Sequence, residues 1–426
     1  MTHFGMICLG ATGHINTLFP LGYELHKRGH QITVFSAPHV QSKAIAAGFK
    51  FRAIGEAEFS LKQDTQLFEQ QGKLSGFAGL RHTIESFRTM VAVGFRDTPA
   101  AIKESGAEAL LVDMSAVQGG TIAEHLNLPF VTVCSALTFY QDEYIPPVNT
   151  LWSYNPGWWA RLRNIAAYRL LEVLIQPVWK VISEHRQIWN LPPYKNFNDL
   201  FSKLAIISQH PVEFEFPNRK LPPWFYFTGP FHDAIGRQKV DFPDEKLTGQ
   251  PLIYASMGTI RNRLKHIFYI IAEACQEIDA QLVISLGGAL EPDTLSNLPG
   301  KPLVVQYTPQ LELLKRTTLT ITHAGLNTTL ESLSNAVPLV AIPISDEQPG
   351  IAARIAWTGV GEVVPLSRLS VSKLRNAIQT VLIEESYKQN AVRLQDAIHR
   401  AGGVCRAADI VEQAVSSREP VINFEF

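Results

Sequence analysis

Two histidines of this 426-residue chain each follow an apolar run and are surrounded by small residues. His14 lies in GATGHIN, residues 10–16, and His323 lies in THAGLNTTLES, residues 322–332. At both places the pattern of a buried strand changes to that of a helix, which predicts a strand-to-helix turn. The free N–H groups and the dipole of a helix start can bind a diphosphate, and an imidazole can accept a proton near neutral pH. The sequence therefore indicates proton transfer and diphosphate binding at two separate turns.

His14 is the candidate general base, because a hydroxyl is a poor nucleophile until its proton is removed. A positioned imidazole accelerates such a step on the order of 10²–10⁴-fold. Asp113 ends the apolar run ALLVD, and a parallel sheet would present both residues at the same edge. There the carboxylate would orient the imidazole and stabilise its positive charge, while the helix N-terminus would keep the free base neutral.

Alone, His14 is more often a cap or surface residue, and Asp113 a turn residue, so the hypothesis depends on the pair. No comparable context is expected around the other candidates, which are Ser135, His82, His125, His185, His210 and His399.

His323 is the candidate for binding a diphosphate. Its imidazole and the first N–H groups of the next helix would converge on one point, and Gly325 would let the backbone approach a ligand closely. Polar residues also follow two other expected strand ends, at positions 309–310 and 346–348. This wider grouping favours a ligand site.

Two residues of this turn allow a purely structural interpretation. Thr328 and Glu331 are spaced as a capping box, in which side chains satisfy the helix N-terminus without a ligand. For these two residues both interpretations stay open.

Residues 307–348 resemble the signature box of the UDP-glycosyltransferase superfamily, which contains inverting enzymes with the GT-B fold. The spacing from His323 to Gln348 agrees with that box. The opening HFGMICLGATGHIN is similar to that of carotenoid (zeaxanthin) glucosyltransferases, in the bacterial branch that glycosylates small molecules. The resemblance implies that an aspartate at the position of Asp113 assists the base at His14.

The resemblance also implies donor-binding roles. It assigns the nucleobase to Tyr307 and Gln310, and the ribose to Glu331. It assigns the phosphates to His323, Gly325, Asn327 and Thr328 together with a second loop of Ser256, Gly258 and Thr259. It assigns the sugar hydroxyls to Glu347 and Gln348.

Three positions depart from the plant form of the box. Tyr307 stands where tryptophan is usual, Leu326 replaces a tryptophan and Glu347 replaces an aspartate. The segment between Tyr307 and His323 is also two residues shorter. These departures leave the base and the hexose open.

Strands alternate with helices in both halves, which predicts an α/β protein with two Rossmann-like, doubly wound domains that face a central cleft, the GT-B architecture. We expect an N-terminal acceptor-binding domain at 1–235, a C-terminal nucleotide-sugar domain at 250–403, and a helix and tail at 404–426 that pack back on the first domain. The strands are expected at 4–9, 31–36, 109–112, 130–134, 252–256, 281–285, 303–306, 319–322 and 339–342.

The segment Phe139–Pro193 interrupts this alternation and is rich in tryptophan and arginine. Three interpretations stay open: helices packed on the N-terminal sheet, a wall or lid for an apolar acceptor, and a weak contact with a membrane surface.

Composition excludes several classes of protein. A formal net charge of -1 argues against binding to nucleic acid. The four cysteines form no CxxC pair and there is no signal-peptide or membrane-spanning pattern, so we expect a cytoplasmic protein. No Asp-x-Asp pair or cluster with metal spacing is present, so we expect catalysis without a metal or another cofactor. The oligomeric state is not indicated.

The sequence thus predicts an inverting glycosyltransferase that moves a hexose, with UDP-glucose as the expected donor, to a hydroxyl of an apolar small molecule. Closure of the two domains would expel water from the reaction. Two alternatives remain at this point, a sugar-nucleotide epimerase and a non-catalytic sugar-nucleotide binding protein. An epimerase would act on the donor alone, and a binding protein would not depend on His14.

Overall fold

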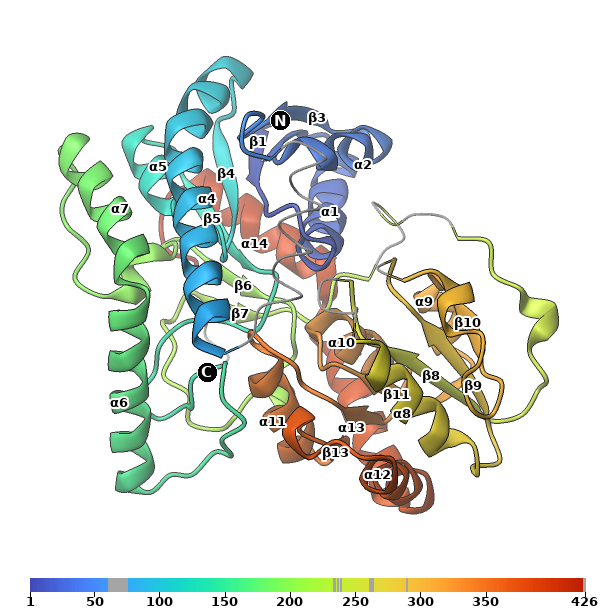
Figure 1. Cartoon of the computed structure of the whole chain (residues 1–426). Coiled ribbons are helices and arrows are strands. Elements are labelled where there is room, and N and C mark those ends of the chain that lie inside the picture. Colours follow the sequence, from blue (N-terminus) through green and yellow to red (C-terminus); the bar gives the residue numbers. More distant parts are fainter. Residues whose placement is uncertain are drawn as a thin grey trace.

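The computed structural model describes residues 1–59, 76–232, 235, 237, 240–259, 264–288 and 290–423. Two parallel sheets form the centres of two domains that lie side by side (Figure 1). This confirms the predicted pair of Rossmann-like domains.

The N-terminal sheet has seven strands in the order β3-β2-β1-β4-β5-β6-β7, and every pair is parallel. Alternate residues of the central strands face opposite sides, so Met6 and Leu111 belong to one core cluster and Ile7 and Leu110 to another. The strands are β1 (His3–Ile7), β2 (Gln31–Ser36), β3 (Lys50–Ala53), β4 (Ala109–Asp113), β5 (Phe130–Cys134), β6 (Ile206–Ser208) and β7 (Phe225–Phe227).

Helices cover both faces of this sheet. Helix α1 begins at Thr12, so His14 lies inside its first turn. The helices of this domain are α1 (Thr12–Lys27), α2 (Gln41–Ala46), α4 (Gly76–Ser105), α5 (Gly119–His125), α6 (Trp158–Leu174) and α7 (Gln176–Ile188).

The C-terminal sheet has six parallel strands in the order β10-β9-β8-β11-β12-β13. Its strands are β8 (Leu252–Ser256), β9 (Gln281–Ser285), β10 (Leu303–Val305), β11 (Thr317–Thr322), β12 (Leu339–Ala341) and β13 (Gly361–Val363). The helices are α8 (Lys265–Cys275), α9 (Gln310–Leu314), α10 (Leu326–Ser334), α11 (Gln348–Thr358), α12 (Val371–Ile383) and α13 (Glu385–Arg400).

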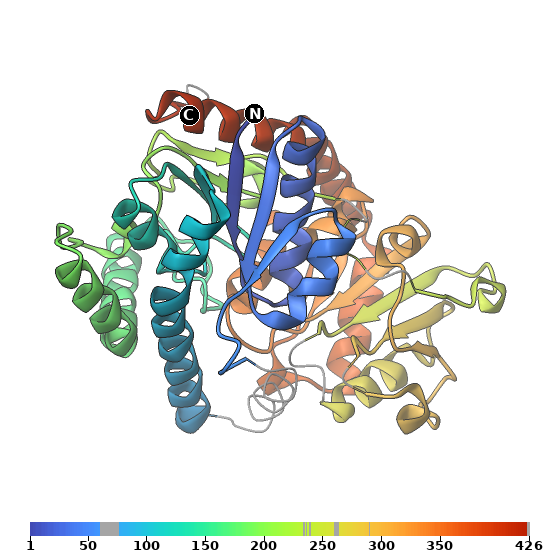
Figure 2. The same ribbon diagram turned by 90° about the horizontal axis from the view of Figure 1, so that it is seen from above.

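The last helix, α14 (Gly403–Ser417), returns to the N-terminal domain and crosses it beside β1 (Figure 2). Its buried residues Ala407, Ala408 and Val411 belong to the same core cluster as Met6 and Leu18. The chain therefore begins and ends in one domain.

Helices α6 and α7 fill the tryptophan-rich segment. Helix α7 packs against α4, and α6 lies at the outer edge of the N-terminal domain in both views (Figures 1 and 2). Within the described part of the chain, no helix combines the length and the apolar character needed to cross a bilayer.

Candidate active site

A cavity of about 400 Å³ lies between the carboxyl ends of the two sheets. Its wall contains His14 and Ser135 from the N-terminal domain, and it contains all the donor residues expected from the sequence, namely Ser256, Gly258, Thr259, Tyr307, Gln310, His323, Gly325, Asn327, Thr328, Glu331, Glu347 and Gln348. The fold thus brings together residues that lie up to 334 positions apart in the sequence (14 to 348).

His14 and Asp113 form a hydrogen-bonded pair at this cavity. Helix α1 carries His14 in its first turn and β4 ends at Asp113, so neighbouring parallel strands direct both residues to one edge. His14 Nδ1 lies 2.6 Å from Asp113 Oδ2, and Asp113 is fully buried. Because Nδ1 contacts the carboxylate, Nε2 is the ring nitrogen available for a proton.

Ser135 also belongs to this group, and the expectation that it has no comparable context was wrong. Its hydroxyl donates to Asp113 Oδ1 at 2.7 Å and lies 2.8 Å from His14 Nδ1. The Ser115 N–H donates to the same carboxylate oxygen at 3.0 Å. Ser135 follows β5, so its contact with Asp113 depends on the pairing of β5 with β4, and the sequence predicted both strands but not their pairing.

Electrostatics around His14 differ from the expectation. Burial disfavours the imidazolium, but the charge of Asp113 and its hydrogen bond outweigh burial and raise the pKa of His14, and Glu347 acts in the same direction. The helix N-terminus therefore does not set the charge state of this base. Burial raises the pKa of Asp113, but His14 and the hydrogen bonds outweigh this and lower it.

His323 lies between two glycine turns. A Cβ atom on Gly258 or on Gly325 would lie 2.6 Å from its ring, so both positions require glycine for this arrangement. Burial lowers the pKa of His323 to about 4, although a backbone hydrogen bond at Ser256 and the charge of Asp346 oppose this effect. A neutral imidazole is therefore present where a diphosphate was expected.

Gln310 and Glu331 are linked at the end of the cavity where the nucleoside is expected. Gln310 Nε2 donates to Glu331 Oε2 at 2.7 Å, and Tyr254 Oη donates to Gln310 Oε1 at 2.8 Å. Arg237, from the segment between the domains, forms an ion pair with Glu331. Sequence reasoning missed Arg237, because nothing in the polar linker indicates which of its charges reaches the cavity.

The capping-box interpretation of Thr328 and Glu331 was wrong. Helix α10 has Gly325 as its N-cap and no side chain caps it, so Glu331 lies too far along the helix for that role. Glu331 is nearly fully buried and its partners come from other elements.

Tyr307 is partly exposed at the cavity edge, and its hydroxyl fills the space above Gly288, where a Cβ would lie only 1.8 Å away. The hydroxyl thus determines where the ring lies, beside the expected nucleobase position.

Asn327 connects the two domains. Its Nδ2 donates to the Gly13 carbonyl at 2.8 Å, and its Oδ1 accepts from Gln209 Nε2 at 2.9 Å. Gln209 also donates to Thr17 Oγ1 at 3.0 Å and to the Ser135 carbonyl at 2.9 Å. The side chain of Asn327 thus joins α10 to the start of α1, and its expected contact with phosphate stays a prediction.

Glu347 and Gln348 lie at the start of α11, facing the cavity from the C-terminal domain. Burial raises the pKa of Glu347, and the neighbouring Asp346 raises it further, while His14 opposes both effects. Gln348 Oε1 accepts from the N–H groups of Ile344 and Ser345 at 2.9 and 3.1 Å, so this amide also fixes the preceding loop.

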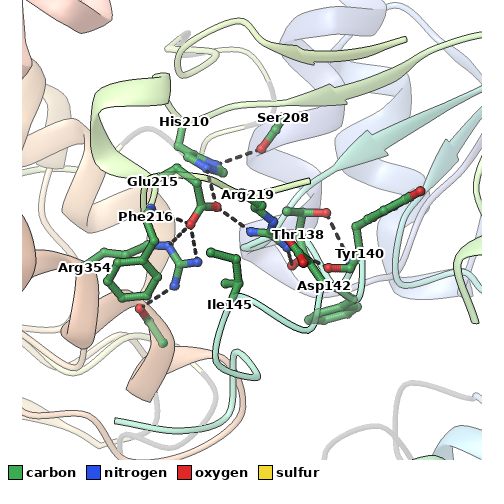
Figure 3. A network of polar contacts seen from close by, with 12 residues as sticks. Thr138, Tyr140, Asp142, Ile145, Ser208, His210, Glu215, Phe216, Arg219 and Arg354 are labelled. Atoms are coloured by element: carbon green, nitrogen blue, oxygen red, sulfur yellow. Dashed lines mark hydrogen bonds and ion pairs between the residues drawn. The ribbon is translucent and has the colours of Figure 1, made fainter. Parts of the chain in front are cut away.

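Helix α11 is held against the N-terminal domain by a buried polar cluster, the Glu215 cluster, made of His210, Glu215, Arg219 and Arg354 (Figure 3). Arg354 Nε, from α11, donates to Glu215 Oε1 at 2.8 Å, and Arg219 binds the other carboxylate oxygen. Arg219 also donates to the Tyr140 carbonyl at 2.8 Å, in the loop that follows Ser135. Burial opposes ionisation, but the two guanidinium groups hold the pKa of Glu215 well below its usual range.

A second cavity, of about 290 Å³, lies on the other side of the His14 turn. Gly10 and Ala11 contribute to it, and Ala11 lines both cavities. The rest of its wall is mostly apolar and includes Ile7, Phe35, Ile54, Phe59, Phe87 and Met90. None of the residues 139–193 lines it, so the expected acceptor wall from that segment does not border this cavity.

The sequence comparisons agree with this geometry. A family model described as UDP-glucoronosyl and UDP-glucosyl transferase matches residues 21–405. The chain belongs to this family. It is 29% identical over 426 residues to a zeaxanthin glucosyltransferase of Pantoea ananas, with 99% of this chain and 98% of that protein covered. It is 30% identical over 424 residues to a zeaxanthin glucosyltransferase of Pseudescherichia vulneris, with coverages of 99% and 100%. It is thus a glycosyltransferase.

Solved structures support the fold. The kitacinnamycin glycosyltransferase has a TM-score of 0.75 at 18% identity, over 97% of this chain and 99% of that one. CalG4, the calicheamicin glycosyltransferase, has a TM-score of 0.72 at 22% identity, over 99% and 100%. Both have the GT-B architecture, which confirms the predicted fold class.

Proposed function

We propose that this glycosyltransferase moves a hexose, with glucose as the expected sugar, from a UDP-sugar to the hydroxyl of an apolar small molecule with inversion of the anomeric centre. The observation that carries the proposal is the His14–Asp113 pair, 2.6 Å apart, at the cavity between the two sheets.

The reaction is a direct displacement. His14 Nε2 takes the proton of the acceptor hydroxyl, the oxygen forms a bond to the anomeric carbon, and the bond from that carbon to the UDP oxygen breaks. Asp113 stabilises the imidazolium that results, as the carboxylate of a hydrolase triad does. Attack from the face opposite the leaving group inverts the centre.

The departing diphosphate gains negative charge, and the start of α10 is suited to bind it. The free N–H groups and dipole of that helix favour an anion, and the neutral imidazole of His323 lines the same cavity. We propose that no divalent metal is required. Activity should persist in EDTA, and a loss that magnesium restores would contradict this part of the proposal.

The apolar cavity beside Gly10 and Ala11 suits the acceptor. Aromatic and aliphatic walls exclude water and bind an apolar body, and Ala11 lines both this cavity and the one that contains His14. The related zeaxanthin glucosyltransferases are named for an apolar alcohol, which supports a carotenoid-like or other apolar alcohol as the acceptor class.

The test combines UDP-glucose with zeaxanthin and a panel of apolar alcohols and phenols, with products identified by mass spectrometry. We expect a glucoside whose anomeric proton has the coupling of the inverted, β configuration. A retained α configuration would contradict direct displacement. An epimerised donor in the absence of any acceptor would instead favour the epimerase alternative.

Replacement of the base separates catalysis from binding. His14→Ala should lower kcat by on the order of 10²–10⁴-fold, while the Kd for UDP, measured by calorimetry, should change little. Unchanged turnover in this variant would favour a protein whose activity does not depend on this pair.

A further inference from the structure

Helix α6 exposes a continuous apolar stripe, which we call the outer face of α6. It contains Trp158, Trp159, Leu162, Ala166, Arg169, Leu170 and Val173, all exposed. Trp158, Leu170 and Val173 are 76%, 60% and 69% exposed. Because these positions recur every three or four residues, they share one side of the helix.

The opposite side of α6 attaches the helix to the protein. Ala160 and Asn164 are buried there, and Asn164 Nδ2 donates to the Glu143 carbonyl at 3.1 Å. Tyr168 Oη donates to the Ile145 carbonyl at 3.2 Å. A surface helix normally directs its apolar side inward, so α6 has the reverse arrangement.

The concentration of exposed apolar side chains is local. Seven of the sixteen large hydrophobic residues that are exposed in the described structure lie between positions 151 and 188. Scattered apolar residues need no explanation, but a contiguous patch marks an interaction surface. Helix α6 lies at the outer edge of the domain, away from both cavities of the active site (Figure 1).

We propose that the outer face of α6 docks this enzyme on the surface of a lipid bilayer. Tryptophan is the side chain that is enriched at the boundary between headgroups and acyl chains, and leucine and valine enter the acyl region. Arg169 is 77% exposed and long enough to keep its charge among the headgroups while its stem lies along apolar surface.

A second copy of the chain fits this surface less well. A helix of 17 residues is about 25 Å long and about 10 Å wide, so one side of it offers roughly 250 Å². A stable protein interface needs about 800 Å² from each partner. A bilayer requires no complementary shape and accepts a single convex helix.

The charges of the helix refine the proposal. Arg161 pairs with Glu143 and Arg169 pairs with Glu172, while Arg163 lies over the ring of Trp152. Three cations and two anions leave a net charge of one (3 − 2 = 1). One positive charge near an anionic surface predicts an affinity only about fivefold higher than for a neutral bilayer. Apolar contacts should therefore dominate the binding.

Docking would keep the enzyme at the bilayer, in which an apolar acceptor dissolves. The docking itself does not depend on the proposed reaction, since it is measured with lipid alone.

Vesicle co-sedimentation of the full chain tests the proposal, with vesicles of phosphatidylcholine and of phosphatidylcholine with phosphatidylglycerol. We expect binding to both, with about fivefold tighter binding to the anionic vesicles. The triple variant Leu162→Ser/Leu170→Ser/Val173→Ser should bind at least tenfold more weakly to both. A matched control, Ile45→Ser/Ile383→Ser, changes residues that are 59% and 77% exposed on other helices and should bind as the unchanged protein does.

Three results would overturn the proposal. The first is no binding of the unchanged protein to either vesicle, and the second is equal loss in the triple variant and its control. The third is a dimer in light scattering that the triple variant dissociates, which would identify a second copy as the partner. Melting curves check that the variants fold, and we expect all of them to melt near the unchanged protein because the altered side chains are exposed.

Discussion

A histidine that removes a proton must be neutral before the reaction and stable as a cation after it. In the proposed mechanism Asp113 meets the second requirement, and its charge and hydrogen bond raise the pKa of His14. Since the base is inactive when protonated, kcat/KM should fall as the pH drops through this pKa, with the acidic limb above pH 6.5.

Asp113→Asn tests this coupling. The variant removes the charge that raises the pKa of His14, and burial, which lowers that pKa, then dominates. The acidic limb should move to lower pH while kcat falls on the order of 10²–10³-fold, because the imidazolium loses its stabilising charge. The measurement is the pH profile of kcat/KM.

Ser135→Ala is the matched control. It removes a hydroxyl that contacts both His14 and Asp113 but keeps the carboxylate. We therefore expect roughly a three- to tenfold loss of kcat and a small shift of the acidic limb of the pH profile. A larger effect than that of Asp113→Asn would mean that the serine, rather than the carboxylate, supports the base.

The glycines beside His323 are a second case in which a single residue decides the geometry. Gly258→Ala places a Cβ 2.6 Å from the His323 ring and also imposes a left-handed backbone (φ +76°) on alanine. We expect the KM for the donor to rise about tenfold or more, since the ring must move out of the phosphate position.

Gly249→Ala separates strain from contact. Gly249 has a similar φ of +82° but nothing within 4 Å of a Cβ, so this variant carries the backbone strain without the clash. It should lose stability by about 1 kcal/mol and keep the donor KM. Equal donor KM values in the two alanine variants would show that contact with His323 is unimportant.

The residues of the site differ in how far the sequence could reveal them. Those within the box, such as Gln310 and His323, were predictable because a short segment contains them in a fixed order. Gln209 contacts Asn327 from 118 positions away and Arg237 contacts Glu331 from 94 positions away, and no local pattern records such contacts. Thr328 and Glu331 had a capping pattern by coincidence of spacing.

At the scale of elements, α11 supports both domains at once. Its N–H of Gly350 donates to the Val148 carbonyl at 2.8 Å, and a Cβ at this position would lie 2.4 Å from that oxygen. Since Glu347 and Gln348 begin this helix, its distance from the N-terminal domain sets their position in the cavity.

Gly350→Ala should therefore impair catalysis although it touches no reacting group. The added methyl pushes the start of α11 away from Val148, and we expect kcat/KM to fall about ten- to hundredfold. Ala356→Gly is the control on the exposed side of the same helix; it should lower stability by about 1 kcal/mol and leave kcat/KM unchanged. Full activity in Gly350→Ala would disprove a positioning role for this contact.

Elements were predictable where the apolar run was long. Strands β2, β5, β8 and β9 match the expected ranges. Strands β3, β6, β7 and β13 have only three or four residues each, which gives a weak periodic signal, and they were missed. The composition of the α6 segment is visible in the sequence, but only the structure shows that the apolar outer face of α6 is exposed.

At the scale of the whole molecule, the Glu215 cluster is the feature that sequence could not reveal. Glu215 and Arg354 are 139 positions apart, in different domains, and both are nearly fully buried. One carboxylate forms ion pairs with two guanidinium groups, so its loss removes two pairs whereas the loss of either arginine removes one. The cluster fixes α11 and the loop after Ser135 to a common point (Figure 3).

We therefore predict that substitutions in and near the Glu215 cluster lower the stability of the protein by different amounts. Glu215→Gln removes the anion that both Arg219 and Arg354 contact, which should cost about 3–5 kcal/mol and lower Tm by about 3–6 °C. Arg354→Met leaves Glu215 paired with Arg219, so the fall in Tm should be clearly smaller. Glu213→Gln makes the same chemical change in an exposed pair with Arg400 and should cost less than about 1 kcal/mol. Differential scanning calorimetry measures the Tm of all three variants. If Arg354→Met lowered Tm as much as Glu215→Gln does, the ion pair between the domains, rather than the shared carboxylate, would hold the cluster together.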